Sequence, residues 1–170
     1  MSIIIKILFR SIIITIFSLN FVYAEDLKKL GKFKDWEAAT TIVDSIKVCF
    51  AQSRPVLQSP KKGDREAGLT VSFRPEEKIF DEVSITSGYE YNSQNSIIAT
   101  SGKSKYKFDI AQGNFAWISN NKVEKKIVKR MKKASRIMVT GYNKSGSQTI
   151  DHYSLMGFTK AYNTVKKICT

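Results

Sequence analysis

The side chains able to do acid–base chemistry are few in this chain, and His152 is its single histidine. It lies in the run TIDHYSL, with Asp151 and Ser154 close by in sequence. Neighbouring strand residues point to opposite faces of a sheet, so Asp151 and His152 are expected to diverge. A Ser-His-Asp triad needs all three side chains in contact. We therefore predict no catalytic residues. We interpret His152 as a structural core or edge residue on a strand face shared with Ile150 and Met156.

The chain has two cysteines, Cys49 and Cys169. In an oxidising compartment two cysteines allow one intramolecular disulfide. The chain-entropy model gives about 4–5 kcal/mol for so long a loop. Free buried thiols and an intermolecular bridge are the alternatives. With His152 the two thiols could supply three zinc ligands, but a disulfide would consume two of them, so no metal site is predicted.

The remaining signals for cofactors and enzymes are weak. Neither of the common glycine-rich phosphate-binding motifs occurs, so no cofactor is expected. Carboxylates are paired at Glu76-Glu77 and Asp81-Glu82, around a turn that follows Pro75. A solvated acidic loop is the ordinary interpretation, and a glycosidase-like carboxylate pair is the remote alternative. We predict that the protein is not an enzyme, with an envelope hydrolase as the alternative.

Positive charge is concentrated near the end of the chain. Residues 121–170 hold 12 lysines and arginines against 2 acidic residues, whereas residues 25–120 hold 14 against 13. Six lysines dominate this block: Lys122, Lys125, Lys126, Lys129, Lys132 and Lys133. Such a block predicts contact with a polyanion, namely anionic lipid, lipopolysaccharide or acidic glycan, with nucleic acid unlikely. A helix face that is simply solvated is the alternative interpretation.

Two segments are predicted to be helical. Residues 121–134 place apolar side chains on one stripe, at Val123, Ile127, Val128 and Met131, with the lysines away from it. Asn121 and Glu124 resemble a capping box at the start of this helix. Residues 159–169 form a second amphipathic segment, for which Thr159 is the expected N-cap.

The rest of the chain is typical of β structure. Residues 25–32 look like a polar lead-in, and short runs with strand character follow. Leu69, Val71 and Phe73 alternate with polar residues, as a half-buried strand requires. AQGN and NKSGS read as hairpin loops. We predict a mainly β fold of about eight strands, an antiparallel β-sandwich or barrel-like sheet with the two short helices. These strands are expected within nine runs of strand character, residues 33–41, 47–57, 69–74, 82–89, 96–100, 106–110, 115–119, 136–142 and 148–155.

The N-terminal 24 residues have the three parts of a secretory signal peptide. Lys6 and Arg10 provide positive charge, residues 11–19 are apolar, and Val22 and Ala24 fit a cleavage site. The charged interruptions make a retained membrane anchor the weaker alternative. We therefore expect residues 1–24 to be removed. Residues 25–170 would form one β-rich domain, with no transmembrane span, in the periplasm or secreted.

Four stretches resemble, in order, the invasion-associated locus B family of small exported alphaproteobacterial proteins. They are KVCFAQS, FRPEEKIFDEVSITSGY, FDIAQGNFAW and VTGYNKSGSQTIDHYSLMGFTKA. The sharpest element is YSLMGFT, residues 153–159, after a hairpin. The resemblance implies a β-sandwich-like domain in the Gram-negative envelope, and it brings no catalytic residues to transfer.

These observations favour a non-catalytic envelope protein that binds a partner or an anionic surface through its basic C-terminal third. A structural or chaperone-like periplasmic protein, which would bind an envelope protein partner along an exposed strand, is a further alternative. Family membership alone does not carry a role in host invasion over to this chain.

Overall fold

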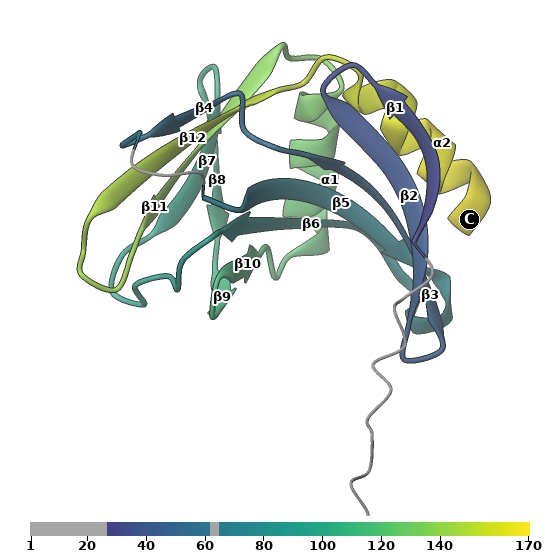
Figure 1. Ribbon diagram of the computed structural model, residues 1–170, viewed down its shortest axis with the longest axis horizontal. Coiled ribbons are helices and arrows are strands. Elements are labelled where there is room, and N and C mark those ends of the chain that lie inside the picture. The colour runs from purple at the N-terminus through teal and green to yellow at the C-terminus, as the bar shows by residue number, and fades with distance from the viewer. Residues whose placement is uncertain (1–26, 62–64) are drawn as a thin grey trace, which may run out of the picture.

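The computed structural model describes residues 27–61 and 65–170, and the predicted signal peptide lies outside them. The described chain forms two antiparallel sheets with two α-helices and a short 3₁₀ turn at Pro75–Glu77 (Figure 1). The predicted mainly β, sandwich-like fold is confirmed, and the sheets do not close into a barrel.

Seven strands form the first sheet in the order β1-β2-β3-β5-β6-β10-β9. Their bounds are Lys28–Phe33 (β1), Trp36–Val43 (β2), Ile46–Ser53 (β3), Ala67–Arg74 (β5), Ile79–Ser87 (β6), Phe115–Trp117 (β10) and Ile110–Gln112 (β9). Five strands form the second sheet in the order β4-β12-β11-β7-β8. Their bounds are Leu57–Ser59 (β4), Gln148–Ser154 (β12), Arg136–Tyr142 (β11), Ile97–Ser101 (β7) and Ser104–Phe108 (β8).

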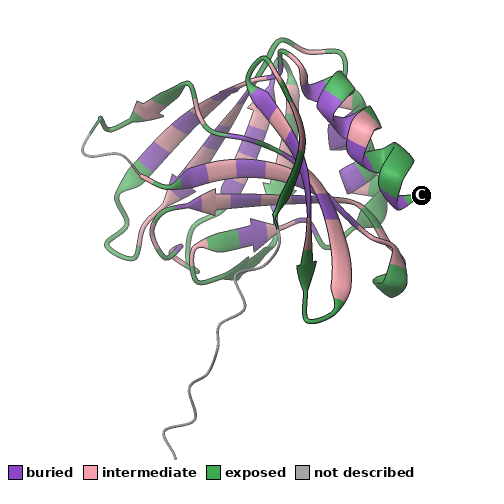
Figure 2. Cartoon of the chain, turned by 45° about the vertical axis from the view of Figure 1, so that its right-hand side comes forward, coloured by how far each residue is buried: buried purple, intermediate pink, exposed green. Residues whose placement is uncertain are grey.

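The core lies where the apolar faces of the sheets and helices meet. The predicted alternation on β5 is confirmed, because Leu69, Val71 and Phe73 are all fully buried. Val83 and Ile85 of β6 point into the same core. Figure 2 shows this alternation of buried and partly exposed residues along the central strands.

The strand prediction fails mainly at the ends of the sheets. The expected polar lead-in, residues 25–32, contains most of β1, which pairs with β2 around a turn at Lys34-Asp35. The AQGN segment does form a hairpin turn, but it joins β9 to β10 rather than joining residues 106–110 to 115–119. The NKSGS hairpin joins β11 to β12, as predicted.

Helix α1 (Asn121–Met131) is amphipathic as predicted, with Ile127, Val128 and Met131 buried. The predicted capping box is wrong. Asn120 is the N-cap, and its side chain accepts a hydrogen bond from the backbone N–H of Lys122. Glu124 instead turns inward and accepts a hydrogen bond from the backbone N–H of Val83, at 2.9 Å.

Helix α2 (Phe158–Cys169) lies across β1, β2, β3 and β5, whereas α1 lies against β6 (Figure 1). Thr159 is not its N-cap, because the helix begins one residue earlier, after Gly157. Gly157 has φ +94°, and a Cβ at this position would overlap the carbonyl group of Phe33. The helix therefore starts at a close backbone approach that only glycine permits.

The predicted disulfide between Cys49 and Cys169 is confirmed. It joins β3 to the last residue of α2, across 120 residues of sequence, with the two Cα atoms 6.2 Å apart. Both cysteines are buried. The bond therefore fixes the end of α2 against the core rather than tying together two surface loops.

Candidate functional site

The six lysines predicted to bind an anionic surface share one side of α1. All six are exposed. At 100° per residue they fall within an arc of about 120°, opposite the buried stripe of the helix. None of them forms an ion pair within the described residues. The helix thus presents a continuous row of positive charge to solvent.

This row continues onto α2 through Lys132, which lies in the turn directly after α1. The Nζ of Lys132 lies 3.7 Å from the centre of the Tyr162 ring, and the Nζ of Lys166 lies 5.8 Å from the same centre. The Thr159 hydroxyl also donates to the backbone carbonyl oxygen of Lys132, at 3.5 Å. We call the six α1 lysines together with Lys166 the lysine face.

The ammonium group of Lys132 lies in an unfavourable electrostatic position where the turn after α1 meets α2. Loss of hydration above the ring lowers the pKa of Lys132, and the nearby ammonium of Lys166 lowers it further, although Asp81 acts in the opposite direction. Asp81 accepts a hydrogen bond from the Tyr162 hydroxyl instead of pairing with a lysine. It sits in a β-bulge of β6, where two residues oppose Phe73 and turn its carboxylate toward α2. Two ammonium groups, those of Lys132 and Lys166, therefore lie near one ring, and within the described residues neither forms an ion pair.

The acidic residues of the terminal third do not neutralise this face, because both are buried. Glu124 is 5% exposed and is turned toward Val83, and Asp151 is 3% exposed and paired with Arg65. Burial raises the pKa of Glu124, the Val83 N–H lowers it, and the neighbouring carboxylates of Glu82 and Asp81 raise it. On the surface of residues 121–170, the excess of basic over acidic side chains is therefore larger than it is in the sequence.

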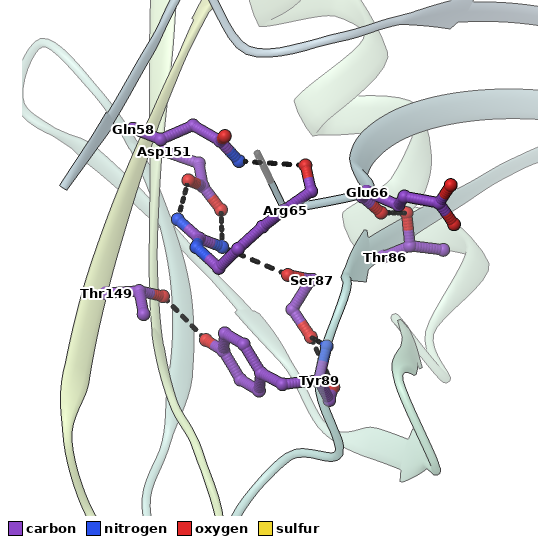
Figure 3. Close-up of polar contacts among 8 residues, drawn as sticks. All are labelled: Gln58, Arg65, Glu66, Thr86, Ser87, Tyr89, Thr149 and Asp151. Atoms are coloured by element: carbon purple, nitrogen blue, oxygen red, sulfur yellow. Dashed lines mark hydrogen bonds and ion pairs between the residues drawn. The ribbon is translucent and has the colours of Figure 1, made fainter. Parts of the chain in front are cut away.

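A second polar cluster joins the two sheets around Arg65 and Asp151 (Figure 3). The Arg65 guanidinium forms a two-pronged ion pair with Asp151 of β12 and donates to the carbonyl oxygen of Ser87 of β6, at 3.0 Å. Beside it the hydroxyls of Tyr89 and Thr149 are 2.6 Å apart. These bonds connect β12 to the end of β6, so the cluster holds the sheets together. The sequence analysis did not predict the Arg65–Asp151 ion pair. The feature that indicates it in the sequence is an acidic residue, Asp151, at an inward-facing position of a strand.

Asp151 and His152 point to opposite faces of β12, as predicted. Asp151 points into the core, whereas His152 is half-buried on the opposite face of β12. His152 shares that face with Ile150, as predicted, but Met156 lies beyond the strand and is 46% exposed. Cys49 and Cys169 are bonded to each other, and no group of three potential metal ligands occurs within residues 27–61 and 65–170.

The predicted acidic loop after Pro75 is also partly structural. Arg74 donates to the Glu82 carboxylate at 2.6 and 2.9 Å and forms a second ion pair with Glu77. Glu82 accepts a further hydrogen bond from Ser72, at 3.0 Å. Glu82 and Glu77 therefore hold the β5–β6 connection, whereas Glu76 and Glu77 are both exposed, as the interpretation of a solvated loop expects.

Comparison with known proteins gives one match. The family model described as "Invasion associated locus B (IalB) protein" matches residues 36–166. No curated protein and no solved structure matches the chain. In the described part of the chain, neither helix has the length and apolar composition to cross a membrane.

Proposed function

The chain belongs to the invasion associated locus B family, and from this premise we propose that it is a non-catalytic cell-envelope protein that adsorbs to anionic lipid or lipopolysaccharide through its lysine face. One observation carries the proposal. Seven exposed lysines line one side of α1 and its junction with α2, and within the described residues no carboxylate pairs with them.

The packing of α1 defines how such binding would work. Amphipathic helices that insert into a bilayer need a free apolar face. Here Ile127, Val128 and Met131 are already buried in the protein core. Binding would therefore be electrostatic adsorption, worth about 1 kcal/mol for each lysine close to an anionic surface. Because exposed charges are screened by salt, the affinity should fall steeply as ionic strength rises.

The buried disulfide supports an envelope setting. A disulfide as deeply buried as Cys49–Cys169 is typical of proteins that fold in an oxidising compartment. We propose that residues 1–24 are removed and that the mature chain resides in the periplasm or is secreted. Mass spectrometry of the protein from a fractionated cell should find an N-terminus at Glu25. A chain retaining Met1 in the envelope fraction would contradict this.

Vesicle co-sedimentation tests the proposed adsorption directly. Native protein should bind phosphatidylglycerol vesicles and lipopolysaccharide at low salt, and should not bind phosphatidylcholine vesicles. Replacing Lys125, Lys126, Lys129 and Lys133 with glutamine should weaken binding by at least 100-fold, from the lysine contributions above. The circular dichroism spectrum and thermal midpoint should not change, because all four side chains are exposed.

A charge-matched variant separates a specific face from net charge. Glutamine at four exposed lysines elsewhere removes the same total charge, at Lys61, Lys78, Lys107 and Lys144. This control should keep most of the binding. Equal losses of binding in the two variants would mean that net charge alone drives adsorption. An affinity that does not change with salt concentration would refute the electrostatic mechanism.

A further inference from the structure

The outer face of the seven-stranded sheet carries an exposed aromatic pair at its β9–β10 end. Phe115 and Trp117 project from the same face of β10, with ring centres 5.7 Å apart and ring planes within 13° of parallel. Phe115 is 44% exposed, and Ile110 beside them on β9 is 47% exposed. Exposed aromatic side chains grouped in this way mark binding surfaces more often than they mark chance exposure.

The two rings stand between two surface hollows. Phe115 lines a hollow of about 520 Å³, which extends over β5 and β3 to the β1–β2 turn. Trp117 lines a second hollow of about 440 Å³, on the side of β6 and the start of α1. The wall of the first hollow thus holds one aromatic ring, Phe115, and the wall of the second holds two, Trp117 and Phe80.

Polar side chains lie across the sheet next to these rings. Thr86 is the direct strand neighbour of Phe115, and Gln52 pairs with Thr70 in the same hollow. The side chains of Gln52 and Thr70 form no hydrogen bond within the described residues, so their donors and acceptors are available. This combination of a ring and free amide and hydroxyl groups suits a ligand with both C–H faces and hydroxyls.

The charges around both hollows balance. The Phe115 hollow is lined by three basic residues (Lys32, Lys34 and Arg54) and three acidic residues (Asp35, Glu37 and Glu66). The Trp117 hollow has Arg74 and Lys78 against Glu82 and Glu124. Several of these groups already pair, as Lys32 does with Glu37 and Arg74 with Glu82. In a chain with net charge +13, this local neutrality favours an uncharged ligand.

We propose that the two hollows form a binding site for a neutral oligosaccharide. One sugar ring packs on Phe115 and another on Trp117, while Gln52 and Thr70 bind hydroxyls of the first. An oligosaccharide is the occupant that combines apolar ring faces, many hydroxyls, no charge and enough length to fill both hollows. Strand faces of other β folds bind oligosaccharides in a similar manner. The site is separate from the lysine face, and it does not depend on the proposed function.

Nuclear magnetic resonance titration with neutral sugars tests the site. The probes are glucose and N-acetylglucosamine, each as a monomer and as β-1,4-linked oligomers up to the hexamer. The chain has two tryptophans, and Trp36 is fully buried, so its indole N–H signal is an internal reference. At least one series should shift the Trp117 indole signal in the millimolar range or below, with affinity rising with oligomer length.

Three variants locate the binding. Phe115→Ala, followed by the Trp117 indole signal, and Trp117→Ala, followed by titration calorimetry, should each weaken binding about tenfold, in line with the loss of one aromatic stacking contact. Leu57→Ala is the matched control, because Leu57 is also exposed but lies on the other sheet, and it should change nothing. The four-lysine variant described above should lose vesicle binding and keep sugar binding, which makes failures of the two proposals distinguishable.

Several results would overturn the proposal. One is the lack of any shift of the Trp117 signal with either series up to its solubility limit. A second is binding that survives Phe115→Ala and Trp117→Ala unchanged. A third is sedimentation showing self-association that Phe115→Ala abolishes, because this face would then belong to an interface with a second copy of the chain.

Discussion

The indole N–H of Trp36 donates to the backbone carbonyl oxygen of Ser154, at 2.9 Å. Trp36 begins β2 in the first sheet, and Ser154 ends β12 in the second. The indole is fully buried, and it also meets the ring of Phe158 edge-on, at 4.7 Å between centres. One side chain therefore joins both sheets and the start of α2.

Replacing Trp36 with phenylalanine should reveal this connection. The change removes the donor, leaves the Ser154 carbonyl unpaired and opens a small cavity, so we expect the free energy of unfolding to fall by about 2–4 kcal/mol. Trp117→Phe is the matched control, since Trp117 lies on the sheet surface, and it should cost under about 1 kcal/mol. Similar values from urea unfolding of the two variants would contradict a special role for Trp36.

The Arg65–Asp151 pair should behave as a buried ion pair. The side chains of Arg65 and Asp151 are 14% and 5% exposed. Asp151→Ala should cost about 3–5 kcal/mol, because it leaves the guanidinium without its partner. The double variant Arg65→Met with Asp151→Leu should recover much of that loss. A double-mutant cycle by chemical denaturation measures both effects, and additive single losses would show that the two residues do not interact.

Glu124 should make stability depend on pH. Its pKa is raised in the folded protein above the ordinary value of 4.5, chiefly by burial. The folded state then holds the proton more tightly. This contribution to stability is complete below the unfolded pKa and is lost as pH rises through the folded pKa. Glu124→Gln keeps an acceptor for the Val83 N–H and cannot ionise.

The stability of Glu124→Gln relative to the native protein should therefore increase with pH from about 4.5 upward. Thermal unfolding between mildly acidic and neutral pH provides the measurement. Glu76→Gln is the control, because Glu76 is exposed. Parallel pH profiles for the Glu124→Gln variant and the native protein would refute the assignment.

Loss of the disulfide should be costly for stability. Replacing Cys49 and Cys169 together with alanine should lower the free energy of unfolding by about 4–5 kcal/mol, given the 120-residue separation. Amide hydrogen exchange should increase first in the last turn of α2, which the bond holds against β3. Reductant should lower the stability of the native protein by a similar amount and leave the variant unchanged. A loss under about 1 kcal/mol would contradict the prediction.

The fold class could be predicted because local patterns and packing agree over most of the chain. Two patterns show this agreement. Leu69, Val71 and Phe73 alternate with polar residues along β5, and apolar residues form one stripe along α1. In both elements the apolar face is the face that is buried. The disulfide could be predicted because the chain has two cysteines and an oxidising compartment was expected. β1 was missed because KKLGKF has no alternation, and this strand is instead held by its pairing with β2.

The finer parts of the sites could not be predicted, because they depend on contacts between distant segments. Glu124 has the spacing of a capping-box residue in the sequence. Only the position of β6 shows that its carboxylate accepts a hydrogen bond from the backbone N–H of Val83. The pairing of β10 with β6 places Phe115 beside Thr86, a register that neither segment encodes alone. The arc of lysines along α1 could be predicted from the sequence. Its continuation to Lys166 could not, because it depends on the position of α2, whose Tyr162 ring lies near both Lys132 and Lys166.

The outermost strands give some of the remaining positive charge a separate role. β4 and β9 have three residues each, which is too short to recruit another chain strongly. The longer outer strands carry exposed lysines, at Lys28, Lys29 and Lys32 of β1 and at Lys105 and Lys107 of β8. Short strands and lysines both disfavour intermolecular strand addition. Two open sheets can therefore coexist with resistance to aggregation, and the exposed lysines of β1 and β8 contribute to that resistance from outside the lysine face.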